Sequence, residues 1–172
     1  MNSIAILGAG TWGMALAKML KNTNKNVTVW SALPDEIEEL SKTSRHPKLP
    51  NVLIPKGIEY TTDIKLAVEN KDIIMFAVPS VFVRQTARKC KDYIKDNQII
   101  VDVAKGIEPD TLFTLTQVID DEIKNKTVKY VALSGPTHAE EVSRDMPTTI
   151  VSACQDIEVA KLVQDFFSSS FM

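Results

Sequence analysis

Three glycines near the start of the chain have the spacing of a phosphate-binding loop. Gly8, Gly10 and Gly13 follow directly on the apolar run 4–7 and stand at the start of a helix-like stretch. In that context the first glycine makes a tight turn, the second lets the backbone approach a pyrophosphate, and the third lets helix and strand pack closely. The N–H groups at the helix start also favour an anion. We therefore predict that the loop binds a dinucleotide; the alternative is a turn with a structural role only.

Lys105 and the segment 134–137 (SGPT) come at the ends of two further predicted strands. Ligands of open α/β sheets bind outside the carboxyl ends of the strands, so both should lie at the ligand-binding edge. Gly135 would leave space there, and Thr137 would offer a hydroxyl beside the N–H groups of the next helix. Thr137 and Glu140 also have the spacing of a capping box, which explains the segment in structural terms. The two roles are compatible, and we expect a small polar or anionic ligand at this edge.

The end of the second predicted strand leaves the choice of dinucleotide open. NAD-binding domains usually carry an acidic residue about 20 residues after the glycine loop, where it holds the adenosine ribose. Here the strand ends in Ser31 and Ala32, with no acidic side chain and no arginine to attract a 2′-phosphate. Asp35 and Glu36 fall in the first turn of the next helix, where capping accounts for them. The predicted cofactor is NAD or NADP, with NADP tolerated.

The remaining reactive side chains lack the patterns that catalysis or metal binding requires. No G-x-S-x-G elbow accompanies His46 or His138, so neither is expected to act directly in chemistry. Cys90 and Cys154 lie far apart without a C-x-x-C pair, which predicts two buried, reduced thiols and neither a disulfide framework nor a zinc site. We predict no metal, because three candidate aspartates show no metal-site spacing: Asp63, Asp72 and Asp102.

Charge and hydropathy exclude several classes of partner. A net charge of −2 over 172 residues gives no basic field for nucleic acid or an anionic membrane surface. No apolar run approaches the ~20 residues that span a membrane, and the first residues lack the basic leader of a signal peptide. We expect a cytoplasmic protein with a small-molecule substrate.

Short apolar runs alternate with amphipathic stretches of helical length, as in a parallel sheet covered on both faces. We predict strands at 4–7, 27–30, 73–78, 99–101, 130–133 and 149–151, and helices at 11–22, 34–44, 62–69, 80–92, 111–124, 137–144 and 156–167. Ser80, Asp110 and Asp156 are the expected caps, and 44–61 is expected to be a proline-rich excursion. The alternation predicts an α/β fold: one doubly wound, mostly parallel, Rossmann-like dinucleotide-binding domain over residues 1–172.

Five motifs together carry a family resemblance: GAGTWG at 8–13, VPS at 78–80, AKGIEP at 104–109, SGPTHAEEV at 134–142 and MPTT at 146–149. In order and spacing they resemble the N-terminal domain of bacterial-type NAD(P)-dependent glycerol-3-phosphate dehydrogenases. The resemblance implies reversible reduction of dihydroxyacetone phosphate to sn-glycerol 3-phosphate with NADH or NADPH, for glycerophospholipid synthesis. It also implies a cytoplasmic enzyme that is a homodimer when full length.

Site residues follow from the resemblance by position. It implies cofactor contacts from Gly8, Gly10, Thr11, Trp12, Gly13, Ser31, Lys48, Phe82, Lys105 and Ala139, and substrate contacts from Lys105, Gly135 and Thr137. The sequence departs from the family pattern at a few of these places. Ser31 and Ala32 replace a common His or Arg, Lys48 stands where an aromatic residue is frequent, and Met14 replaces a common Thr.

The resemblance also implies that the chemistry is incomplete within these residues. The family places its proton-donating lysine in a helical second domain, which we expect to be absent here, and hydride transfer to a carbonyl needs a general acid. The chain is therefore expected to be part of a longer two-domain enzyme that binds dinucleotide but is nearly inactive alone, with no catalytic residue of its own. Two alternatives stay open: another Rossmann dehydrogenase acting on a hydroxy or sugar acid, and a nucleotide-binding module without catalysis.

Overall fold

The computed structural model describes residues 1–124 and 127–172, and over these residues it contains one seven-stranded sheet in the order β3-β2-β1-β4-β5-β6-β7. The strands pair in parallel except β7, which runs antiparallel to β6. Their bounds are Ser3–Leu7 (β1), Asn26–Trp30 (β2), Glu59–Thr61 (β3), Ile73–Phe76 (β4), Ile99–Asp102 (β5), Lys129–Ser134 (β6) and Val151–Ala153 (β7). The predicted doubly wound, mostly parallel Rossmann-like sheet is thus confirmed.

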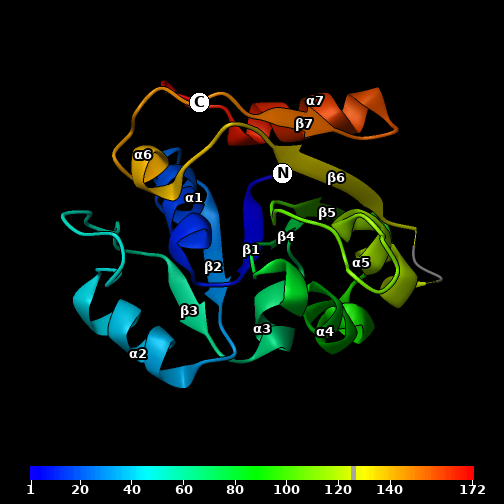
Figure 1. The fold of residues 1–172 in the computed structure, drawn as a ribbon. Coiled ribbons are helices and arrows are strands. Elements are labelled where there is room, and N and C mark those ends of the chain that lie inside the picture. Colours follow the sequence, from blue (N-terminus) through cyan, green and yellow to red (C-terminus); the bar gives the residue numbers. More distant parts are fainter. Residues whose placement is uncertain (125–126) are drawn as a thin grey trace.

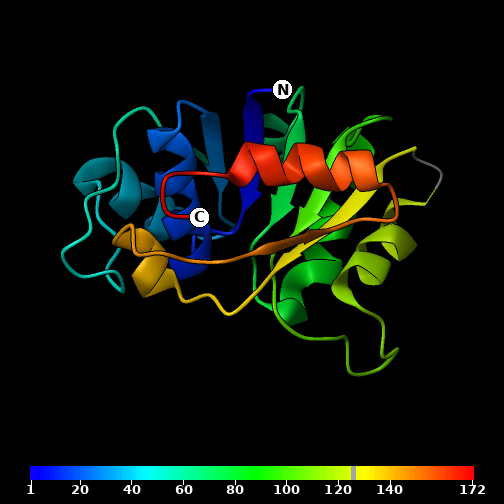
Figure 2. The same ribbon diagram turned by 90° about the horizontal axis from the view of Figure 1, so that it is seen from above.

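Helices cover both faces of the sheet. Their bounds are Thr11–Asn22 (α1), Pro34–Thr43 (α2), Ile64–Val68 (α3), Ser80–Cys90 (α4), Leu115–Ile123 (α5), Ala139–Ser143 (α6) and Ile157–Phe167 (α7), with a short 3-10 turn at Lys91–Tyr93. Figure 1 shows α3 and α4 below the sheet and α1, α6 and α7 above it. Seen from above in Figure 2, α7 lies across the sheet on the side of α1.

The central strands are buried on both sides, which explains their unbroken apolar runs. Residues 4–7 of β1 and 73–76 of β4 are fully buried, and each packs against two separate hydrophobic layers. One layer holds α1 and α7, and the other holds α3, α4 and α5. This double cover fixes β1 and β4 next to each other, so that the loops following them meet at one edge.

Several predicted boundaries and caps are wrong. The helix predicted from residue 111 begins at Leu115, because Leu112 adopts a left-handed conformation (φ 59°) and Ile107 pairs with Thr114 across a loop. Thr114 forms the capping box with Gln117, and Asp110 caps nothing there. Asp156 is confirmed as the cap of α7.

The caps predicted at Ser80 and Thr137 are also wrong. Pro79 is the residue before α4, so Ser80 is already helical, and no side chain in the described part of the chain caps that end. The helix after Thr137 begins at Ala139 with His138 at its cap position, so the Thr137–Glu140 capping box does not form. The Thr137 hydroxyl instead lies 3.5 Å from the carbonyl oxygen of Gly135.

Three further expectations need adjustment. The excursion 44–61 ends in strand β3, which was not predicted because only three residues, Glu59–Thr61, pair with β2. The run predicted at 149–151 becomes strand β7 two residues later. Cys90 is buried but Cys154 is only partly so, and both are free thiols. Among the described residues no helix is long and apolar enough to cross a membrane.

Candidate functional site

Two of the three loop glycines are required by the packing of the protein itself. Gly8 has φ +127°, and a Cβ there would lie 2.7 Å from the carbonyl carbon of Ala77. A Cβ on Gly13 would collide with the carbonyl oxygen of Gly8. These two positions therefore close the turn between β1 and α1 and seat the helix on the strand, as predicted for the first and third glycines.

Gly10 differs from its two neighbours in the motif. Its φ of −68° suits any residue, and a Cβ built there would have no protein atom within 4 Å. Nothing in the described part of the chain therefore requires glycine at this position. The bare backbone leaves a space at the start of α1, which is where a pyrophosphate approaches the loop in dinucleotide-binding domains.

The first turn of α1 is equipped to receive an anion. The helix ladder begins with Met14, whose N–H donates to the Gly10 carbonyl at 2.9 Å, and among the described residues no side chain caps the helix. The N–H groups of the preceding turn, from Thr11 to Gly13, thus point out of the helix end. Trp12 adds a buried indole nitrogen, Nε1, without a hydrogen-bond partner among the described residues. An orphaned buried donor is costly and is typical of a site that a ligand completes.

A cleft of about 380 Å³ opens beside this helix start, at the carboxyl edge of the sheet. It brings together residues from four separate motifs of the sequence. The lining residues are Gly10, Thr11, Trp12, Ala77, Val78, Pro79, Val103, Ala104, Lys105, Thr137, His138, Ala139 and Glu140. The predicted meeting of the glycine loop, Lys105 and the segment after β6 is thus confirmed by the structure.

Lys105 connects the two sides of this cleft. Its side chain reaches across from the end of β5, and its Nζ donates a hydrogen bond to the Thr137 carbonyl oxygen at 3.0 Å. An ammonium group has three N–H donors, so two remain for a ligand. Lys105 therefore brings a positive charge to the wall opposite the α1 start.

Gly135 and Thr137 are held by the fold around them. A Cβ on Gly135 would lie 2.7 Å from the carbonyl oxygen of Thr149, so the missing side chain permits close packing on the segment before β7. The expectation that the missing side chain of Gly135 leaves space for a ligand is therefore wrong, because the backbone of Thr149 and Ile150 occupies that space. Gly135 still lines a second hollow of about 410 Å³, on the far side of Lys105. Thr137 is almost fully buried, with 4% of its surface exposed.

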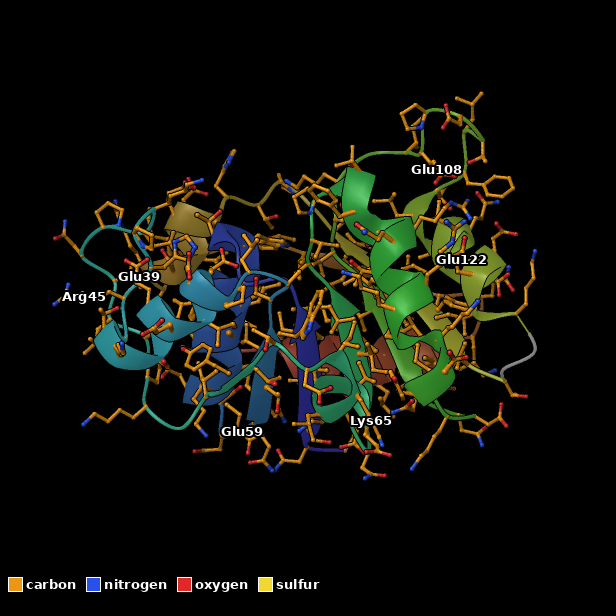
Figure 3. The ribbon with its side chains drawn as sticks, turned by 90° about the horizontal axis from the view of Figure 1, so that it is seen from below. Glu39, Arg45, Glu59, Lys65, Glu108 and Glu122 are labelled. Carbon is orange, nitrogen blue, oxygen red and sulfur yellow. The ribbon has the colours of Figure 1, made fainter. Side chains whose placement is uncertain are left out.

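An ion-pair network holds the loop that follows Lys105. Arg84 of α4 donates to both carboxylate oxygens of Glu108, through Nε at 2.6 Å and Nη2 at 2.7 Å. Its Nη1 donates to Asp121 and Glu122 of α5, each at 2.7 Å. The hydrogen bonds from Arg84 lower the pKa of Glu108 to about 2. Figure 3 shows Glu108 and Glu122 on the same side of the molecule.

Asp102 lies at the end of β5, just before Lys105, and is buried. Its Oδ1 accepts the N–H of Ala104 at 3.1 Å, which shapes the strand end, and it lines the second hollow. Burial raises the pKa of Asp102 to about 7. This carboxyl group is therefore poised to change charge near neutral pH.

The other predicted cofactor residues lie outside the cleft. Ser31 follows β2 and is buried, with its hydroxyl donated to Glu36 Oε2 at 2.5 Å. Lys48 is exposed on the excursion, and Phe82 is 51% exposed in the first turn of α4. None of the three lines the cleft.

Sequence reasoning missed several residues that the structure places near the site. Glu36 had been explained as a helix cap, yet no side chain caps α2, and Glu36 contacts Ser31 instead. Arg84 gave no sequence signal, because its partners lie 24 to 38 residues away along the chain. Val78 and Pro79 belong to the VPS motif, whose place after a buried strand marked the same edge of the sheet.

Other regions carry no comparable arrangement. A wider hollow of about 610 Å³ lies between α5 and strands β6 and β7, and of the described residues around it none belongs to the predicted site. The described part of the chain also holds no group of three His, Cys, Asp or Glu side chains that is placed to bind a metal. The cleft at the glycine loop is therefore the candidate functional site.

Comparison with known proteins points to one family. Residues 3–160 match the family described as NAD-dependent glycerol-3-phosphate dehydrogenase N-terminus. A glycerol-3-phosphate dehydrogenase [NAD(P)+] of Lactobacillus delbrueckii subsp. bulgaricus is 61% identical over 100% of this chain and 52% of its own length. One of Fusobacterium nucleatum is 46% identical over 97% of this chain and 50% of its own length.

Solved structures agree with this match. The glycerol-3-phosphate dehydrogenase of Coxiella burnetii superimposes with a TM-score of 0.91 at 28% identity, covering 99% of this chain and 52% of that one. A UDP-glucose dehydrogenase of Pyrobaculum islandicum, at 16% identity and a TM-score of 0.72, shares the fold alone. The chain spans about half the length of the curated relatives it matches.

Proposed function

The chain belongs to the family of NAD-dependent glycerol-3-phosphate dehydrogenase N-terminal domains, and from this premise we propose that it is the cofactor-binding domain of such an enzyme. The whole protein reversibly reduces dihydroxyacetone phosphate to sn-glycerol 3-phosphate with NADH or NADPH and serves glycerophospholipid synthesis. The relatives carry the name glycerol-3-phosphate dehydrogenase [NAD(P)+]. Residues 1–172 constitute one dinucleotide-binding domain in this proposal.

The single observation that carries the proposal is the space beside Gly10. Protein packing accounts for Gly8 and Gly13, whereas Gly10 has no described protein atom within 4 Å of the place where its side chain would begin. A loop with a structural role alone would not need a glycine at position 10. The first N–H groups of α1 and the indole nitrogen of Trp12 also lack hydrogen-bond acceptors among the described residues, and a bound anion or dinucleotide would supply acceptors.

The residues divide the binding task along the edge of the sheet. The N–H groups of Thr11, Trp12 and Gly13 hold the pyrophosphate at the helix start, with Gly8 closing the turn beneath them. Ser31 and Lys48 serve the adenosine end, while Phe82 and Ala139 serve the nicotinamide end. When bound, the dinucleotide supplies or accepts the hydride.

Lys105, Gly135 and Thr137 form the substrate side of the proposed site. Lys105 places its ammonium group at the cleft, where it attracts a phosphorylated substrate and stabilises negative charge that develops on a carbonyl oxygen. We assign the general acid to the part of the relatives' length that this chain does not cover. The cytoplasmic location and the homodimer stay predictions.

Substitution of Gly10 by valine tests the proposed function. A Cβ at residue 10 has no described protein atom within 4 Å, and the branched side chain fills the space proposed for the pyrophosphate, so we expect folding to be retained and NADH binding to be lost. We expect an affinity lower by about 100-fold or more, since several charged hydrogen bonds are lost together.

Calorimetric titration with NADH, alongside thermal unfolding, measures both effects. Ala153→Val is the control, because it introduces the same β-branched side chain at an exposed strand position away from the loop. Equal NADH affinity in Gly10→Val and wild type would place the cofactor elsewhere and contradict the proposal.

A further inference from the structure

We propose that Glu36, held at the end of β2 by Ser31, accepts the adenosine ribose 2′-hydroxyl and makes this domain select NAD(H) over NADP(H). This inference rests on the proposed cofactor-binding function. It names the residue that sets cofactor choice, which the sequence pattern at the end of β2 left open.

The first step is the position of Ser31. The N–H of Gly8 donates to the Trp30 carbonyl at 2.9 Å, so the end of β2 is joined directly to the glycine loop. Ser31 is the next residue, and its own N–H donates to the Thr61 carbonyl of β3 at 3.3 Å. Ser31 is thus fixed between two strands at the place where Rossmann domains meet the adenosine ribose.

The second step is the contact between Ser31 and Glu36. The Ser31 hydroxyl accepts the N–H of Leu33 at 3.1 Å and donates its own proton to Glu36 Oε2 at 2.5 Å. This pair of bonds turns the chain into α2 and draws the Glu36 carboxylate back to the strand end. An acidic group therefore occupies the customary ribose-binding place, although it comes from the next helix.

The third step is that the carboxylate keeps capacity for a ligand. Glu36 is only partly buried, and among the described residues the Ser31 hydroxyl alone donates a hydrogen bond to its side chain. Within residues 1–124 and 127–172 no side chain caps α2, so the Glu36 carboxylate does not accept hydrogen bonds from the start of its own helix. An ionised carboxylate accepts about four hydrogen bonds, which leaves Oε1 for a ribose hydroxyl.

The fourth step concerns the charged groups around Glu36. His46 lies close enough to Glu36 to feel its charge. The His46 ring is buried, and burial lowers the pKa of His46, so the imidazole is neutral near pH 7. Its ring is held between the Lys48 N–H, which donates to Nδ1 at 3.1 Å, and the Ala9 backbone of the glycine loop. The described residues give Glu36 no ion pair, and a 2′-phosphate beside its carboxylate would meet a like charge.

The inference is tested by measuring the affinities of NADH and NADPH for the 172-residue chain and its variants. Wild type should bind NADPH about tenfold or more weaker than NADH. Glu36→Gln keeps the size of the side chain and its contact with Ser31 but removes the charge. The affinity for NADPH should therefore rise, and the ratio of the NADH affinity to the NADPH affinity should fall toward one. Ser31→Ala keeps the charge of Glu36 but removes the hydrogen bond that holds its carboxylate at the end of β2. The affinity ratio should therefore lie between those of wild type and Glu36→Gln.

Glu39→Gln is the matched control, because it removes the same charge from an exposed position one turn along α2. It should leave the NADH to NADPH ratio unchanged. Equal affinities in wild type, or a ratio in Glu36→Gln that equals that of wild type, would overturn the inference while the cofactor-binding function stands. Binding of neither dinucleotide by folded wild type would overturn the proposed function itself.

Discussion

The candidate site has two halves, the glycine loop after β1 and the region of Lys105 after β5, and different forces hold them in place. At the glycine loop, backbone against backbone fixes the shape: Gly8 packs on Ala77, and Gly13 packs on Gly8. At Lys105, side chains fix the shape, through the Arg84 network behind Glu108 and the bond from Lys105 to Thr137. Figure 3 shows Glu39 and Arg45 near α2 and Glu108 and Glu122 on the opposite side, beside α5.

This difference predicts how each half responds to change. Steric packing of backbone is insensitive to pH and salt, and it fails when atoms are added. Charged side chains respond to pH and ionic strength, and they fail when a partner is removed. Substitutions that add atoms should therefore disrupt the glycine-loop half, and substitutions that remove a charged partner should disrupt the Lys105 half.

Gly13→Ala should have the largest effect, because a single methyl group would meet the Gly8 carbonyl oxygen. Overpacking at such a backbone contact costs about 3 kcal/mol or more of unfolding free energy. Urea unfolding measures it, with Gly10→Ala as the control that should change stability by less than about 1 kcal/mol. Equal stabilities of the two variants would remove the distinction between packing and ligand-binding glycines.

A pH effect should come next and should belong to the Lys105 half. Burial raises the pKa of Asp102 to about 7, so the folded state favours the protonated acid. Its contribution to stability is fully present below about pH 4 and is lost as the pH rises through 7, at about 1.4 kcal/mol for each unit by which the pKa is raised, less any relaxation around the buried group.

Denaturant unfolding from pH 4 to 8 tests this contribution by comparison with Asp102→Asn. The variant stays neutral, so its stability should lack the fall between pH 4 and 7 that wild type shows. Asp110→Asn, in the exposed loop beyond Lys105, is the control and should follow wild type. Parallel profiles for wild type and Asp102→Asn would contradict the assignment.

The smallest of these effects should follow from Arg84→Met. Loss of the guanidinium frees Glu108 and leaves it near Asp121 and Glu122 without their shared partner. Amide hydrogens of 104–114 should exchange a few-fold faster, whereas those of the glycine loop should not change. Arg88→Met is the control, since Arg88 is more exposed and, among the described residues, bonds to Glu122 alone. Uniform acceleration in both halves would mean that the network stabilises the whole fold instead of this loop.

The same contrast explains what could be predicted from the sequence. The glycine loop is a local pattern, so its turn, the helix that follows and the open backbone at Gly10 could be predicted from residues 4–13. The doubly wound, mostly parallel sheet followed from the alternation of apolar runs and helices, whereas the short strand β3 did not. The cap at Asp110 was wrong because the left-handed conformation of Leu112 delays the start of α5. The cap at Thr137 was wrong because α6 begins only at Ala139, with His138 at the cap position.

Contacts between distant residues could not be predicted in this way. Glu36 looked like a capping residue because its spacing fits the first turn of α2, and only the structure shows its contact with Ser31. Arg84 is an unremarkable basic residue until α4 and α5 pack side by side. Motif resemblance located Lys105, Thr137 and Ala139 at the cleft without supplying any of these contacts.

A crystal structure of the chain with NADH bound tests the central claim most directly. The account predicts the pyrophosphate against Gly10, within hydrogen-bonding distance of the N–H groups that begin α1, and the nicotinamide toward Lys105. A dinucleotide bound instead in the hollow between α5 and β6, with the space at Gly10 empty, would contradict it.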